Sequence, residues 1–322
     1  MTAPFTEHEH HFDVFGTQVR LLVGAPAGEP FTARLAALRV QRTMHDLHAK
    51  LTRFEPGSEL SRLNARSGQP IAVSSTLLDA VQAAIFAAEV SEGLVDPTIT
   101  PHLERAGYAR SRAGEPPADL RAALETAPRR RPAARAPRSG WERLVIDPED
   151  GTVQLPSGTR LDLGGSAKGL AVDIAARMLA DRPTFAIDAG GDIRLGGTAR
   201  VPRTVNIAHP LTDTDAHRFT LHDGAVATSG LRTRIWKTAA GHAHHLIDPS
   251  TGEPAWTGVI QATALARTAL EAETLAKVAL LRGPHAGRRV LERHGGGALI
   301  LDDGELLLVG ALATTPHGLV AA

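Results

Sequence analysis

The feature that most constrains this chain is a double-glycine turn ahead of an amphipathic helix, in the stretch Leu161-Asp-Leu-Gly-Gly-Ser-Ala-Lys-Gly-Leu-Ala-Val-Asp173. A short apolar strand is predicted before the turn, and apolar residues recurring every three or four positions predict a helix after it. Gly164 and Gly165 would let a ligand approach the backbone, and Ser166 can cap the helix. The helix N-terminus attracts anions, and Lys168 adds a positive charge. The stretch predicts a phosphate or pyrophosphate site; the alternative is an ordinary turn with a solvated Lys168.

Two common phosphate-binding motifs do not match this stretch. A nucleotide P-loop requires four residues between its first glycine and a Gly-Lys-Ser/Thr sequence, whereas Gly169 follows Lys168 here. The G-x-G-x-x-G pattern of dinucleotide-binding folds is also absent. The spacing therefore indicates a less common kind of anion site.

Composition excludes several classes of function. The 35 basic and 35 acidic residues cancel, so no overall positive field favours nucleic acid or an anionic membrane. The chain has no cysteine, which rules out disulfides, thiolate metal sites and cysteine nucleophiles. Neither a secretory leader nor an apolar run of membrane-spanning length is evident in the sequence. We therefore expect a soluble, cytoplasmic protein with no nucleic-acid or membrane partner.

The order of predicted elements indicates a single domain of the α+β class, with mixed or antiparallel sheets packed by helices. We expect residues 1–11 to be a disordered polar tail and residues 12–322 to form the domain, with a strand over residues 12–23. Residues 128–140 read as a basic, proline-rich loop insertion in contact with solvent. Periodicity predicts helices over residues 31–52, 74–92, 269–282 and 284–294, and a closing hairpin over residues 298–309.

Six short motifs occur in order along the chain. They are Ser58-Glu-Leu-Ser-Arg-Leu-Asn64, Asp96-Pro-Thr98, Asp162 to Asp173, Ala189-Gly-Gly-Asp192, Thr228-Ser-Gly230 and His245-Leu-Ile-Asp-Pro-Ser-Thr-Gly252. Each motif is weak alone, but six in order are specific. In this order the chain resembles the ApbE family of FAD:protein FMN transferases, and the resemblance covers nearly the whole chain, from about Phe12 to Val309.

This resemblance implies an α+β globule that binds FAD in a cleft between lobes, with Mg²⁺ at the pyrophosphate. It also implies a reaction in which FMN moves from FAD to a serine or threonine hydroxyl of an acceptor protein, and AMP is released. The bound metal would polarise the phosphoryl group, and a base would accept the hydroxyl proton. FAD and an acceptor protein are thus the expected partners.

The resemblance also suggests roles for individual residues. His245 is the candidate base, Lys168 the candidate catalytic cation at the pyrophosphate, and Ala167 and Glu273 the positions nearest the metal. Phe54 and Tyr108 are the aromatic residues best placed to stack on the flavin. The remaining candidate cofactor-binding residues are Asn64, Asp96, Thr98, Asp162, Gly164, Gly165, Ser166, Gly190, Gly191, Asp192, Ser229, Gly230 and Lys277.

Several of these residues also have an ordinary structural interpretation. His245 could be a hydrogen-bonded strand histidine, Phe54 a core residue and Asp162 a carboxylate that only accepts from backbone amides. At the level of function, the alternatives are a protein that binds FAD without transferring FMN and a hydrolase of the FAD pyrophosphate.

One segment departs from the family pattern. Where the family has Ala-Asp-Ala-Leu-Ala-Thr, with Asp and Thr as magnesium ligands, this chain has Ala272-Glu-Thr-Leu-Ala-Lys277. An ammonium group cannot ligate Mg²⁺, which needs close oxygen ligands. Glu273 and Lys277 are four residues apart in the order that favours a helical ion pair. Either Lys277 takes the place of the metal and pairs with Glu273, or the two form a surface pair and the segment is misaligned.

Overall fold

A single antiparallel sheet of eight strands organises the computed structural model, which describes residues 5–314 and 319–320. Every neighbouring pair in this sheet is antiparallel. In spatial order the strands are β1 (Phe5–Val14), β2 (Thr17–Pro26), β6 (Phe185–Ala189), β7 (Asp192–Gly196), β10 (Gly224–Gly230), β15 (Val259–Ala266), β16 (Gly296–Leu301) and β17 (Leu306–Gly310).

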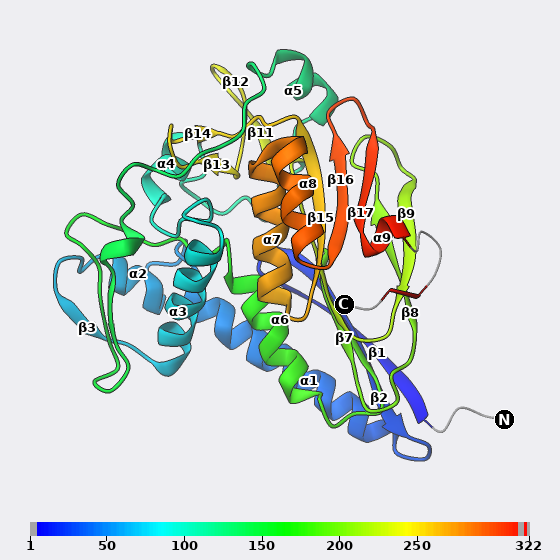
Figure 1. Cartoon of the computed structure of the whole chain (residues 1–322). Coiled ribbons are helices and arrows are strands. Elements are labelled where there is room, and N and C mark those ends of the chain that lie inside the picture. Colours follow the sequence, from blue (N-terminus) through cyan, green and yellow to red (C-terminus); the bar gives the residue numbers. More distant parts are fainter. Residues whose placement is uncertain (1–4, 315–318, 321–322) are drawn as a thin grey trace.

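A layer of helices packs along this sheet (Figure 1). The layer consists of α1 (Pro30–Leu51), α6 (Ala167–Met178), α7 (Ala269–Leu281) and α8 (Gly283–Arg293). Helix α1 packs on β1 and β2, α6 on β6 and β7, and α7 on β10 and β15. All eight residues of β15 are buried, which explains why its sequence reads as a nearly continuous run of apolar and small residues.

Smaller elements surround these two layers. Two three-stranded sheets are β18 (Leu319–Val320), β9 (Asp215–Leu221) and β8 (Arg203–Ala208), and β3 (Pro70–Ala72), β5 (Thr152–Gln154) and β4 (Val145–Asp147). Two hairpins are β11 (Ile235–Thr238) with β12 (Gly241–His244), and β13 (Ile247–Asp248) with β14 (Glu253–Pro254). The remaining helices are α2 (Glu59–Asn64), α3 (Ser75–Val90), α4 (Thr100–Arg105), α5 (Leu120–Thr126), the 3₁₀ turn η1 (Trp141–Arg143) and α9 (Ala311–Thr314).

The predicted α+β class is confirmed, and the predicted long helices agree with the observed ones to within two residues at each end. Local signals explain this agreement. Ser58 and Ser74 accept hydrogen bonds from Ser61 N and Leu77 N, so both serines cap their helices as side-chain oxygens commonly do. Within the described residues, no helix combines the length and the apolar character that a membrane crossing requires.

The predicted polar tail is wrong for the residues that the structure describes. Residues 5–11 belong to β1, which pairs with β2 along its whole length. The expected strand over residues 12–23 is in fact a hairpin that turns at Phe15 and Gly16, both with positive φ. Long-range pairing explains the error, because β2 pairs with every residue of β1 and one histidine of the segment contacts α1. His10 Nε2 lies 2.7 Å from Gln41 Oε1 of that helix. Residues 1–4 lie outside the described residues.

The basic insertion is irregular and largely exposed, as predicted, and it is also anchored to the protein by backbone hydrogen bonds. Residues 127–140 contain no helix or strand. Arg131 N donates to Trp256 O at 2.9 Å, and Ala133 N donates to Leu281 O at 2.8 Å. Ala133 is buried in the main core. The loop therefore replaces regular pairing with backbone bonds to the segments beside it, which local sequence reading could not detect.

The contact between α6 and α7 generates the first prediction. A Cβ added at Gly169 would lie 2.7 Å from Leu270 Cα and 2.8 Å from Ala269 O, and neither backbone atom can move alone. Replacing glycine with alanine inside a helix normally raises the free energy of unfolding by about 1 kcal/mol. We expect Gly169→Ala instead to lower the free energy of unfolding by about 1–3 kcal/mol, measured by urea titration.

The matched control is Gly57→Ala, because an added Cβ there meets nothing within 4 Å. Its expected effect is within about 0.5 kcal/mol of zero. A stabilising effect of Gly169→Ala would show that the two helices can separate without cost.

Candidate functional site

A cavity of about 460 Å³ lies at the N-terminal end of α6. Its wall includes the C-terminal end of β10, the side of α7 that carries Glu273 and Lys277, and the loops around α4 and β11. Most residues predicted from the sequence meet here. They are Phe54, Asp96, Tyr108, Asp162, Gly164, Gly165, Ser166, Ala167, Lys168, Gly190, Asp192, Ser229, Gly230, His245, Glu273 and Lys277.

Three predicted cofactor-binding residues lie behind this wall instead. Asn64 holds the backbone of Leu161 with both side-chain groups, at 2.7 and 2.9 Å. Thr98 donates its backbone N–H and its hydroxyl to Asp96 Oδ1. Gly191 bonds to Asp188 Oδ1 and to the backbone of Thr228. The hydrogen bonds of these three residues to neighbouring groups hold the wall in place.

The expected strand before the double-glycine turn is wrong. Residues 161–163 are not in a strand, because their backbone groups pair with a side chain and a loop rather than with a neighbouring strand. The Asn64 side chain hydrogen-bonds to both the N–H and the C=O of Leu161, and Asp162 N donates to Pro97 O at 2.8 Å. Further upstream, Arg160 is fixed to Glu104 of α4 by two hydrogen bonds. These bonds position the turn at the cavity.

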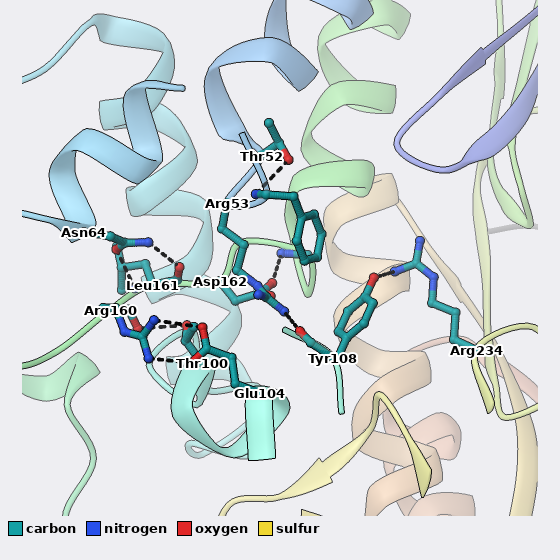
Figure 2. A network of polar contacts seen from close by, with 12 residues as sticks. Thr52, Arg53, Asn64, Thr100, Glu104, Tyr108, Arg160, Leu161, Asp162 and Arg234 are labelled. Carbon is teal, nitrogen blue, oxygen red and sulfur yellow. Dashed lines mark hydrogen bonds and ion pairs between the residues drawn. The ribbon is translucent and has the colours of Figure 1, made fainter. Parts of the chain in front are cut away.

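Asp162 and Arg53 form the next layer of support, which Figure 2 shows in the centre of the view. One carboxylate oxygen of Asp162 accepts from Gly164 N at 2.7 Å, and the other pairs with the Arg53 guanidinium. Arg53 also donates to Tyr108 O. Asp162 therefore does satisfy a backbone amide of the turn, and its carboxylate is neutralised by Arg53. Arg53 is not among the residues predicted from the sequence, although it directly precedes the predicted Phe54.

Ser166 does not cap α6 with its side chain, contrary to the expectation from the sequence. Instead, a carboxylate from another helix accepts a hydrogen bond from the first turn of α6. Glu273 Oε2 accepts from Gly169 N, in the first turn of α6, at 2.9 Å. The positive end of α6 thus has an anion from within the protein as a neighbour, as helix dipoles favour.

Four charged side chains, Lys168, Asp192, Glu273 and Lys277, form a cluster between α6, β7 and α7, which we call the lysine–carboxylate cluster. Lys168 Nζ pairs with Asp192 and lies 3.8 Å from Glu273 Oε1. Lys277 Nζ contacts the same Glu273 oxygen at 2.8 Å. The surface-pair alternative for Glu273 and Lys277 is therefore wrong, because both residues are buried.

The acidic and basic groups of this cluster stabilise one another's charged forms. Burial alone would raise the pKa of Glu273, but Lys277 and Lys168 outweigh it and lower that pKa. Burial would lower the pKa of Lys168, but Asp192 and Glu273 raise it. Burial raises the pKa of Asp192 to about 6, against the attraction of Lys168. At pH 7 the Lys168 ammonium group therefore faces the carboxylates of Asp192 and Glu273.

The donor set does not fit the magnesium ion that the family resemblance implies. Both oxygens of Glu273 accept hydrogen bonds, from Lys277 and from Gly169 N, and Asp192 is paired with Lys168. An ammonium group stands where an oxygen ligand would be needed. Among the described residues, no group of three or more His, Asp or Glu side chains could hold a metal ion. We therefore assign no metal role to Ala167 or Glu273.

Aromatic side chains form another part of the cavity wall. The rings of Phe54 and Tyr108 meet edge to face at 5.4 Å, and Tyr108 stacks on Trp236 at 5.6 Å. The Arg53 guanidinium lies 4.3 Å from the centre of the Phe54 ring. Tyr108 and Trp236 are largely buried in a small apolar cluster of their own. The sequence analysis missed Trp236, which comes shortly after the Thr228-Ser-Gly230 motif and could have been found from that proximity.

His245 and Arg234 bring polar groups to the same cavity. His245 Nδ1 lies 3.4 Å from Arg234 O, and because a carbonyl can only accept, Nδ1 carries the hydrogen and Nε2 the lone pair. Burial, with the charge of Arg234, holds the pKa of His245 well below its usual value, so the ring is neutral at pH 7. The Arg234 guanidinium reaches Tyr108 Oη at 3.4 Å (Figure 2). The sequence analysis did not identify Arg234.

The support given by Asn64 is testable. In Asn64→Leu, the N–H and C=O groups of Leu161 lose both partners, so we expect the free energy of unfolding to fall by about 2–4 kcal/mol. Gln154→Leu is the control, because its long 3.4 Å bond to Gly68 O is exposed and should contribute less than about 0.5 kcal/mol. Equal effects of the two changes in urea titrations would contradict a structural role for Asn64.

The neighbouring His244 predicts a pH effect on stability. Burial lowers its pKa to about 3 in the folded protein, from 6.5 in an unperturbed histidine. Below pH 6.5 the unfolded chain therefore takes up a proton that the folded protein does not. The contribution of His244 to the free energy of unfolding is therefore fully present above pH 6.5. It is lost as the pH falls towards 3, by up to about 1.4 kcal/mol per pH unit.

Replacing His244 with glutamine should remove this contribution. We expect the free energy of unfolding of His244→Gln to depend less steeply on pH between 6 and 4 than that of the unmodified protein. The exposed His285→Gln serves as the control and should leave the slope unchanged. An unchanged slope in His244→Gln would contradict the assignment.

Comparisons with known proteins agree with the fold. An FAD:protein FMN transferase of Treponema pallidum is 30% identical over 84% of this chain and 77% of its own length. One of Vibrio cholerae is 29% identical over 82% of this chain and 79% of its own length. The solved structure of the ApbE protein of Thermotoga maritima superposes with a TM-score of 0.80 and 24% identity, covering 97% of this chain and 99% of that one.

A second solved structure, the flavin transferase ApbE from Vibrio cholerae, gives a TM-score of 0.73 with 24% identity over 97% of this chain and 99% of that one. At this identity, the two structures establish the shared fold. Residues 15–301, most of the chain, match the sequence model of the ApbE family. This protein therefore belongs to the ApbE family.

Proposed function

We propose that this protein is an FAD:protein FMN transferase, which moves FMN from FAD to a serine or threonine hydroxyl of an acceptor protein and releases AMP. The observation that carries the proposal is one cavity that joins an aromatic wall to a cationic turn, in a chain of the ApbE family. FAD has the same two chemical parts, a flat flavin ring and a diphosphate. Relatives named FAD:protein FMN transferase support the same activity.

The aromatic wall is the proposed site of the flavin. Phe54 is the least enclosed of the three rings, since Tyr108 and Trp236 use part of their faces on each other. A flavin ring beside Phe54 would gain offset or edge contacts and cover apolar surface. Arg53 behind the ring is held by Asp162, so it would fix the position of Phe54 without moving when the ligand binds.

The diphosphate is proposed to lie at the turn before α6. Gly164 and Gly165 line the cavity, and the first turn of α6 supplies the positive end of a helix dipole. Lys168 and Lys277 reach the cavity from α6 and α7. A diphosphate bound there would lie within reach of the ammonium groups of both helices.

In the proposed reaction, the acceptor hydroxyl oxygen attacks the phosphorus atom on the FMN side of the diphosphate. The new P–O bond joins FMN to the acceptor, and the bond to the bridging oxygen breaks, so AMP leaves with the electron pair of that bond. The hydroxyl proton passes to His245 Nε2, which is free to accept because the ring is neutral. Because the donor set does not fit Mg²⁺, no step is assigned to a metal.

The proposed function is tested by measuring the transfer of FMN to an acceptor protein. The purified protein would be incubated with FAD and a lysate of the organism that encodes it, followed by denaturing gels read for flavin fluorescence and by chromatography for AMP. We expect AMP and a fluorescent acceptor band together. His245→Gln should reduce the initial rate by about 10²-fold or more, because it removes the proton acceptor. His285→Gln should leave the rate unchanged.

Other outcomes would support the alternatives. AMP formed without a labelled protein would indicate hydrolysis of FAD, and bound FAD without AMP would indicate a binding protein. The pH profile offers a second check. Since the pKa of His245 is well below its usual value, the acid limb of the rate should lie below pH 6.5. An acid limb at or above that pH would contradict His245 as the base.

A further inference from the structure

We propose that the lysine–carboxylate cluster replaces the divalent cation, so that this protein binds the diphosphate of FAD without a metal. The inference rests on the proposed function, because it assumes that FAD is the ligand. It concerns the chemistry by which the ligand is held. It arises from the mismatch between the donor set and Mg²⁺, and from the three ion-pair contacts that give the cluster its shape.

The cluster is layered, with its cations towards the cavity and its anions behind them. Exposed fractions are 19% for the Lys168 side chain and 11% for Lys277, but only 1% for each of Asp192 and Glu273. A ligand in the cavity would therefore meet ammonium groups first. The carboxylates beneath hold the ammonium groups in position and, by attraction, keep Lys168 charged.

Hydrogen bonding leaves each ammonium group with capacity for a ligand. Lys277 Nζ has three N–H donors and bonds to Glu273 Oε1 at 2.8 Å. Lys168 Nζ bonds to Asp192 and lies farther from Glu273, at 3.8 Å. Each lysine thus keeps donors for phosphate oxygens, and charge-assisted bonds of this kind are stronger than neutral ones.

The choice of residue is also unusual for this chain. Only four of its 35 basic residues are lysines, Lys50, Lys168, Lys237 and Lys277, and two of them meet in the cluster. An ammonium group is a compact point charge, whereas guanidinium is a broad planar fork. Between α6, β7 and α7, a compact ammonium group can contact a single carboxylate oxygen, in the way that a metal ion would.

The central experiment measures FAD binding to the unmodified protein by titration calorimetry, with EDTA and then with Mg²⁺. We expect the two dissociation constants to agree within about twofold. Mn²⁺ added alone, followed by electron paramagnetic resonance, should show no tight binding to the protein. FAD affinity that needs Mg²⁺, or tight Mn²⁺ binding in the absence of FAD, would overturn the inference. These measurements need no variant, so they do not depend on the folding of a mutant.

Variants then test the role of Lys277. Lys277→Met should weaken FAD binding in EDTA by about tenfold or more, whereas Lys277→Arg should retain most of the affinity because it keeps the charge. Lys237→Met, an exposed lysine outside the cavity wall, is the control and should bind as the unmodified protein does. Unchanged affinity in a folded Lys277→Met would overturn the proposal.

The double variant Glu273→Asp with Lys277→Thr restores the oxygen donors of the family pattern. We expect it to bind FAD weakly in EDTA and to recover at least about tenfold in affinity with Mg²⁺. If Mg²⁺ does not improve FAD binding by this variant, the result contradicts the inference that a lysine replaces the metal ion. FAD that does not bind the unmodified protein in either buffer would overturn the proposed function as well, whereas FAD that binds only with Mg²⁺ would overturn this inference alone.

Discussion

The structure depends on a few charges buried between two helices and a strand. Glu273 is almost fully inaccessible, yet it contacts the first turn of α6 and the ammonium group of Lys277, and it lies near Lys168. A buried carboxylate is costly unless it is paired and hydrogen-bonded, so these contacts constrain the distance between α6 and α7. Gly169 permits that distance, since a side chain there would collide with the backbone of α7.

The cluster also explains how the cavity is divided. One end carries cations supported from behind by carboxylates, and the other carries the rings of Phe54, Tyr108 and Trp236. Asp162 and Arg53 lie between the two ends and hold both, since Asp162 bonds to the turn and Arg53 stacks on Phe54. A ligand with a planar ring and a diphosphate would contact both ends at once, which is the physical basis of the proposed function.

Much of the fold could be predicted because its signals are local. The caps at Ser58 and Ser74, the amphipathic period of α1 and the Asp-Gly turn between β16 and β17 act over a few residues, and all are present in the structure. The predictions failed where distant partners decide the conformation. His10 in β1 bonds to Gln41 of α1, and Leu161 bonds to Asn64. None of these pairs shares a periodic pattern.

For the candidate site, the sequence by itself determined the double-glycine turn, the helix that follows and the pairing of Glu273 with Lys277, because residues four apart on a helix must be neighbours. Only the tertiary structure decided that this pair is buried and that its carboxylate reaches α6, 104 positions away in the chain. It likewise decided that Lys168 meets Asp192 of β7 and that Trp236 completes the aromatic wall. Such contacts follow from packing helices onto the sheet, which brings together charges and rings whose separation along the chain carries no local signal.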